Sequence, residues 1–332
     1  MTADPSLHVS SRHEFLAAVP YLLGFHPADS VVVVAFRDRR VLCAARAGRD
    51  DPVAHTAEVL RRQGADAAAI IGYGGYEQVT PAVQRMSAAL RARDVPVVDE
   101  FRVTDGRYWS YRCTDPDCCP PEGTPCRVDQ TVVAAQATYD GQVLLPDREA
   151  LVARLAAVTG PERAAISAAT ERARDRLAEA MPHGVRRSGR AAVRAAEVRY
   201  RSGGRLTDDE VAWLGMLLVE TGIRDYAWVR TAGEDWRIAL WTDVLRRVDP
   251  LYAPAPASLL GFAAWRQGQG ALANAAIQRA LAAEPHYPMA HLIGQILHEG
   301  VPPDLLDLTP PRAAKRRRRG GTRSRAHGRT VS

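Results

Sequence analysis

The segment Ser30–Phe36 places the strongest constraint on the fold of this chain. It reads SVVVVAF, a run of mostly β-branched residues with no polar interruption after the serine. A strand with one solvated face alternates apolar and polar residues, so this unbroken run predicts a strand that is covered on both faces. Covering both faces requires a layer on each side of the sheet, which favours an α/β domain.

The neighbouring residues predict the other parts of that domain. The expected elements are a helix from Arg12 to the Pro20 turn, strand 30–36, its hairpin partner 41–45, helix 53–62, strand 67–72, a helix opened by Thr80-Pro81 that ends near Arg93, and strand 95–98. Strands that alternate with helices predict an α/β domain in which at least two strands run parallel. We expect this domain to occupy residues 1–140, with a cysteine-rich loop near residues 113–126.

The sequence changes character after Asp147, where alanine-rich stretches with apolar residues three and four apart predict an all-α domain at residues 147–308. The pattern LG-x6-G-x4-A begins at Leu214 and occurs again at Leu260. The second copy resembles a tetratricopeptide helix pair, in which small residues allow two antiparallel helices to approach closely. The alternative is two ordinary helical hairpins that share small-residue contacts.

The basic charge of the chain is concentrated at its end. Residues 309–332 carry nine of the 44 arginines and lysines and no acidic residue, so the formal net charge of +6 is a property of this tail. A segment with this composition buries too little apolar surface to fold alone and is expected to be disordered. Nonspecific nucleic-acid binding through the tail is the function that its charge suggests.

Other features restrict the classes of function. Lys315, in the tail, is the only lysine, which excludes a phosphate-loop lysine, a Schiff-base lysine and a Ser-x-x-Lys pair in a folded site. The prevalence of arginine and alanine is typical of a high-GC bacterial genome. The sequence starts without a secretory signal and contains no run long enough to span a bilayer, so we expect a cytoplasmic protein with no membrane partner.

Four of the five cysteines, Cys113, Cys118, Cys119 and Cys126, fall in the stretch YRCTDPDCCPPEGTPC. Four thiolates would satisfy the tetrahedral preference of zinc. The spacing is irregular, because a gap of four residues precedes a vicinal pair whose side chains tend to diverge. Redox-active or disulfide-forming thiols and reduced structural cysteines are therefore alternatives to a metal site.

Two further segments lie where loops reach functional pockets. His26 and Asp29 precede the buried strand and are candidate catalytic residues, although a turn that starts the strand explains them as well. The glycines of IIGYGGYEQVTP follow a strand and precede a helix, but Glu77 stands where a dinucleotide fingerprint needs its third glycine. A glycine turn is the better explanation there. His291 and His298 are interpreted as surface residues.

The strings PYLLGFHPADSVVVVAF, WSYRCTDPDCCPPEGTP and GVPPDLL resemble the bacterial family named domain of unknown function 4192, over about residues 8–308. The resemblance implies no substrate, cofactor or catalytic residue. The leading hypothesis is a binding or regulatory module that recognises a protein or peptide through its C-terminal helices. The alternatives are an enzyme that uses His26 and Asp29, with zinc on the cysteines, and a nucleic-acid-associated protein. Catalysis predicts a pocket that joins His26 or Asp29 to a second polar group, whereas partner binding predicts an exposed apolar groove on residues 207–300.

Overall fold

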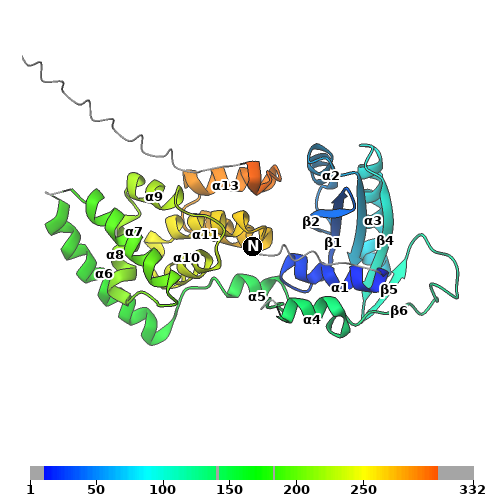
Figure 1. Ribbon diagram of the computed structural model, residues 1–332, viewed down its shortest axis with the longest axis horizontal. Coiled ribbons are helices and arrows are strands. Elements are labelled where there is room, and N and C mark those ends of the chain that lie inside the picture. Colours follow the sequence, from blue (N-terminus) through cyan, green and yellow to red (C-terminus); the bar gives the residue numbers. More distant parts are fainter. Residues whose placement is uncertain (1–10, 140–141, 182–183, 306–332) are drawn as a thin grey trace, which may run out of the picture.

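The computed structural model describes residues 11–139, 142–181 and 184–305, which form an α/β unit followed by a helical unit (Figure 1). The predicted fold class, an α/β domain followed by an all-α domain, is confirmed. The predicted disordered tail, residues 309–332, lies outside the described residues.

The α/β unit is built on a six-stranded sheet with the strand order β2-β1-β3-β4-β5-β6. The strands are β1 (Ser30–Arg37), β2 (Arg40–Gly48), β3 (Ala67–Tyr73), β4 (Val97–Thr104), β5 (Arg107–Ser110) and β6 (Thr124–Pro125). Strands β3 and β4 run parallel, which confirms the predicted parallel pair, and the other neighbours are antiparallel.

Helices cover both faces of this sheet. The helices of the unit are α1 (Arg12–Leu23), α2 (Val53–Arg62), α3 (Tyr76–Arg91) and α4 (Val132–Tyr139). Val31 and Val33 of β1 face α2 and α3, whereas Val32 and Val34 face α1. All four valines are at most 1% exposed, so the SVVVVAF run lies between two apolar layers as its composition requires.

Two helix boundaries differ from the prediction. Helix α1 begins at Arg12, with the Ser11 hydroxyl accepting from the Glu14 N–H, but it continues through Pro20 to Leu23. Helix α3 begins at Tyr76, several residues before the expected Thr80-Pro81 start. The Gln78 side chain accepts from the backbone N–H of Gly75, so this glycine starts the helix and Pro81 lies inside it.

The helical unit follows a short connecting helix. Its elements are α5 (Arg148–Ala153), α6 (Gly160–Ala180), α7 (Arg186–Arg201), α8 (Asp208–Leu217), α9 (Thr221–Trp228), α10 (Asp235–Arg247), α11 (Pro254–Arg266), α12 (Gly270–Ala283) and α13 (Pro288–His298). One apolar core runs through these helices. Trp241 and Phe262 are among its largest fully buried side chains.

Helices α11 and α12 form the predicted antiparallel hairpin. Gly261 lies on α11, and Gly268 lies in the turn between the helices with a φ of 75°. The first copy of the pattern differs, because Gly215 of α8 faces Val248 and Gly222 lies inside α9 rather than in a turn. A repeat relationship between the two copies therefore stays a prediction.

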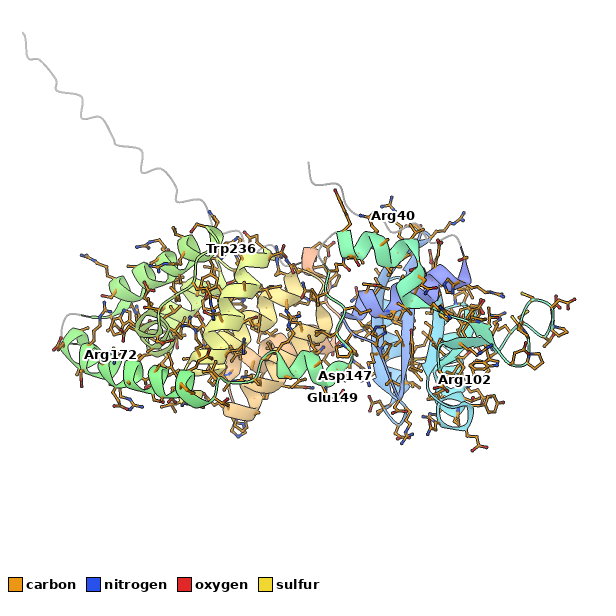
Figure 2. The ribbon with its side chains drawn as sticks, turned by 90° about the horizontal axis from the view of Figure 1, so that it is seen from below. Arg40, Arg102, Asp147, Glu149, Arg172 and Trp236 are labelled. Atoms are coloured by element: carbon orange, nitrogen blue, oxygen red, sulfur yellow. The ribbon has the colours of Figure 1, made fainter. Side chains whose placement is uncertain are left out.

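The two units touch through α2 and the end of α13. The rings of His55 and His298 stack with their centroids 3.8 Å apart, and Arg62 pairs with Glu299 at 2.5 Å. Gly300 leaves space for Val59, since a β-carbon there would lie 2.5 Å from a Val59 methyl group. Figure 2 shows Asp147 and Glu149 where the connecting segment passes between the units.

Candidate functional site

A pocket of about 440 Å³ lies at the carboxyl ends of the parallel strands β3 and β4. Ligands in α/β sheets bind outside the carboxyl ends of the strands, because the loops and helix starts converge there. Its apolar wall comes from Leu16 and Pro20 of α1 together with Val103 and Val128. We refer to this site as the strand-end pocket.

The polar part of the strand-end pocket unites three loops. His26 and Asp29 come from the loop before β1, Gln78 from the first turn of α3, Thr104 from the end of β4 and Asp105 from the turn that follows it. The pocket therefore joins the two candidate residues to further polar groups, as the enzyme hypothesis requires. Among the described residues, its lining contains two carboxylates and no arginine or lysine, which gives it a negative electrostatic character.

Backbone contacts hold the His26 loop in place. The His26 N–H donates to the Leu145 carbonyl at 3.0 Å, and the Leu145 N–H donates to the Gly24 carbonyl at 3.1 Å. Asp29 has a φ of 44°, a left-handed conformation that aspartate tolerates better than most residues. Leu145, in the segment that leads to the helical unit, thus holds the loop at the entrance of the strand-end pocket. No local sequence pattern predicts this contact.

Two buried hydroxyl groups of the α/β unit have no hydrogen-bond partner among the described residues. They are Tyr73 Oη, on a residue that lines the strand-end pocket, and Ser30 Oγ, on the residue opposite Tyr73 in the β1–β3 ladder. Tyr73 is 7% exposed, and burial raises the pKa of its phenol. A buried hydroxyl without a partner is costly, so a hydrogen-bond partner at either group would stabilise the protein.

The amides of Gly74 and Gly75, at the start of α3, are bonded within the fold. The Gly74 N–H donates to the Val103 carbonyl, and the Gly75 N–H donates to the Gln78 side chain. These two donors are already used within the fold. The geometry therefore agrees with a glycine turn rather than with a phosphate cradle.

The four clustered cysteines separate into two groups. Cys113, Cys118 and Cys119 place their sulfur atoms within 4.8 Å of one another, and we refer to them as the thiol cluster. Cys126 is buried and lines the strand-end pocket instead, where burial raises its pKa. All these cysteines are free thiols in the structure. The four-cysteine site expected from the sequence is thus reduced to three neighbouring thiols.

Arg12 lies over the thiol cluster from the first turn of α1. Its Nη1 is 3.9 Å from Cys118 Sγ and 4.0 Å from Cys119 Sγ, and its Nε donates to Asp99 at 3.1 Å. A hydrogen bond from Cys119 lowers the pKa of Cys113, whereas burial raises the pKa of Cys119 to about 12. Cys113 therefore loses its proton more readily than Cys119.

A second group of potential metal ligands, His55, His298 and Glu299, lies between the two units. The histidine rings are nearly parallel, with 8° between their planes, and their lone pairs point along those planes rather than at a common point. His55 Nε2 bonds the His298 carbonyl at 2.9 Å, and Glu299 pairs with Arg62. These contacts join the α/β unit to the helical unit. His298 was interpreted as an ordinary surface residue, but its ring and its carbonyl both take part in this contact between the units.

The helical unit contains a groove of about 460 Å³ between α6, α7 and α8, with Trp213 and Leu214 on its wall. Arg176 lies over the Trp213 ring, 4.2 Å from its centroid. The groove overlaps the predicted partner surface, residues 207–300, only at α8. No described helix is both long enough and apolar enough to cross a membrane.

Comparison with known proteins identifies the family. The model of the family described as "Domain of unknown function (DUF4192)" matches residues 13–304, so the chain belongs to this family. No curated protein and no solved structure matches the chain.

Proposed function

For this member of a family whose description states no activity, we propose that the α/β unit binds a small organic cation, an amine with an apolar portion, in the strand-end pocket. The observation that carries the proposal is the pair of carboxylates, Asp29 and Asp105, on the lining of a pocket that also includes Tyr73, whose buried hydroxyl has no partner among the described residues. A volume of about 440 Å³ is within the range of small-molecule sites.

The charge of the lining supports a cation. Asp29 and Asp105 approach the strand-end pocket from two different loops, and a bound ammonium group would neutralise part of their charge. Like charges repel and opposite charges attract, so the two exposed carboxylates would repel an anionic ligand and attract an amine. The apolar wall of Leu16, Pro20 and Val103 provides a surface for the hydrocarbon part of the ligand.

The hydroxyl groups of Tyr73 and Thr104, with the Gln78 amide, provide directional contacts. They would distinguish amines by the position of a hydroxyl or carbonyl group, because an unmatched buried polar group costs affinity. If the protein is an enzyme, His26 is the residue of the pocket that would act on the bound amine. Peptide recognition by the helical unit is a separate proposal, for which the groove beside Trp213 is the starting point.

The test is a thermal-shift screen of the purified full chain against small primary amines and their N-acetyl forms, which keep the shape but lose the charge. We expect amines to raise the melting temperature and the acetylated forms to leave it unchanged. A ligand at about 100 times its Kd stabilises a protein by about 2.7 kcal/mol, which is several degrees. Equal shifts from both forms, or none from any amine, would overturn the proposal.

Asp29→Asn is the test variant, and Asp38→Asn is its matched control. Both aspartates flank β1 and both have positive φ, 44° for Asp29 and 52° for Asp38, which asparagine also tolerates. Only Asp29 lines the strand-end pocket. The amine-induced shift should therefore decrease in Asp29→Asn and persist in Asp38→Asn.

A further inference from the structure

We propose that the thiol cluster of Cys113, Cys118 and Cys119 is a zinc site in which Arg12 is the counter-charge. The site is separate from the strand-end pocket, since none of its residues lines that pocket. The inference is therefore independent of the proposed function.

The sulfur geometry matches a zinc tetrahedron. Zinc–sulfur bonds of about 2.3 Å place two thiolates of a tetrahedral site about 3.8 Å apart. Cys118 Sγ and Cys119 Sγ are 3.9 Å apart, and Cys113 Sγ is within 4.8 Å of both. The vicinal cysteines thus converge, whereas their adjacency in the sequence suggested that they would diverge.

The loop that carries these thiols is ordered by its own backbone. The Cys119 N–H donates to the Asp115 carbonyl at 2.7 Å, and the Asp117 N–H donates to the Asp115 carboxylate at 3.0 Å. At the start of the loop, the Cys113 N–H donates to the Ser110 hydroxyl at 3.2 Å. These bonds bring Cys119 back beside Cys113, so the ligands are arranged before an ion arrives.

The charges balance in the bound state. Each thiol that binds the ion loses its proton to solvent, and three thiolates with Zn²⁺ leave one negative charge. Arg12 supplies one positive charge at 3.9 to 4.0 Å from two of the sulfurs, and Asp99 holds the guanidinium in that orientation. Cys118 is exposed, so the fourth coordination position is reached from solvent by water or a solute.

The experiment measures metal in the full chain purified under reducing conditions without chelator. We expect about one zinc per chain by elemental analysis. Cobalt added to the metal-free chain should give the charge-transfer and visible bands of a tetrahedral cobalt thiolate. Zinc should also protect three of the five thiols from a thiol reagent, a readout that needs no variant. Absence of metal, absence of those bands, or a disulfide within the cluster would overturn the proposal.

Serine variants locate the site. Cys113→Ser, Cys118→Ser and Cys119→Ser should each reduce zinc affinity at least about tenfold, whereas Cys43→Ser and Cys126→Ser should retain it. Loss of binding in Cys126→Ser would contradict the three-thiol assignment. Arg12→Ala should weaken binding about tenfold and Arg12→Lys should restore most of it, because lysine keeps the charge.

Discussion

Gly261 on α11 lies directly against Ile277 on α12, such that a β-carbon at Gly261 would come within 2.7 Å of Ile277 Cδ1 and 2.9 Å of its Cγ1. Any side chain at this position would therefore have to displace Ile277 or move the two helices apart. The same contact explains why Gly261 is tolerated in the middle of α11, where glycine lowers helix propensity by about 1 kcal/mol relative to alanine.

Substitution of Gly261 should separate the two helices. We expect Gly261→Leu to lower the free energy of unfolding by about 1 to 3 kcal/mol through overpacking. Gly261→Ala should cost less, because only the end of Ile277 has to move and alanine favours the helix. Gly270→Ala is the control, since a β-carbon at Gly270 meets nothing within 4 Å. Urea denaturation measures all three, and equal stability of Gly261→Leu and Gly270→Ala would contradict the close-contact assignment.

A buried carboxylate joins three segments of the helical unit. Glu197 on α7 is 6% exposed at its side chain and pairs with Arg230 and with Arg237, whose side chain is 7% exposed. Glu197→Ala removes one of the two carboxylates that pair with the buried Arg237 and leaves Glu234 as the other, so we expect a loss of about 1.5 to 3 kcal/mol of unfolding free energy. Glu171→Ala removes an exposed pair with Arg174 and should cost less than about 1 kcal/mol. Chemical denaturation distinguishes the two, and a similar small loss in both would refute the role of Glu197.

The main architecture was predictable because its signals are local. The SVVVVAF run and the strand–helix alternation reflect burial and periodicity that each segment carries by itself. The start of α3 was not predictable from Thr80-Pro81, because Gly75 and the Gln78 side chain begin the helix earlier. Strands β5 and β6 are short, which leaves little periodicity to detect.

The sites depend on contacts between distant segments. His26 and Asp29 were identified from their loop position, but Thr104, Asp105 and Tyr73 join them only through the sheet order. The stacking of His55 on His298 joins residues 243 apart in the chain, and no sequence pattern indicates it. The convergence of Cys118 and Cys119 comes from a backbone turn at Asp115, whereas residue spacing alone suggested divergence.

Asp243 on α10 makes the stability of the helical unit depend on pH. Burial alone would raise the pKa of Asp243, but hydrogen bonds from Arg247, Tyr200 and Arg205 lower it overall. A carboxylate with a lowered pKa stabilises the fold above the pKa of the unfolded chain, about 3.9, and this contribution is lost as the pH falls through the folded-state pKa.

Asp243→Asn tests this dependence. The variant should be less stable than the natural chain at pH 7. The difference should shrink as the pH falls below about 4, because the carboxylate of the unfolded chain takes up its proton there while that of the folded chain stays ionised to a lower pH. Unfolding free energies of both chains across this pH range provide the measurement. A stability difference that stays constant with pH would show that the Asp243 charge contributes nothing.

Tyr73 and Tyr108 form a matched pair that separates a ligand contact from a structural contact. Both are 7% exposed and belong to the core between the sheet and α1. The Tyr108 hydroxyl bonds Thr124, whereas the Tyr73 hydroxyl has no partner among the described residues. Removal of a satisfied hydroxyl costs about 0.5 to 1.5 kcal/mol, while removal of an orphaned one is neutral or stabilising.

Tyr108→Phe should therefore lower the free energy of unfolding, and Tyr73→Phe should leave it unchanged or raise it. The order reverses for ligand binding, because only Tyr73 lines the strand-end pocket. The melting-temperature shift caused by a bound amine should decrease in Tyr73→Phe and persist in Tyr108→Phe. Denaturation without ligand and thermal shift with ligand give the two readouts. If Tyr73→Phe destabilises the free protein as much as Tyr108→Phe does, the Tyr73 hydroxyl has a structural partner and is not reserved for a ligand.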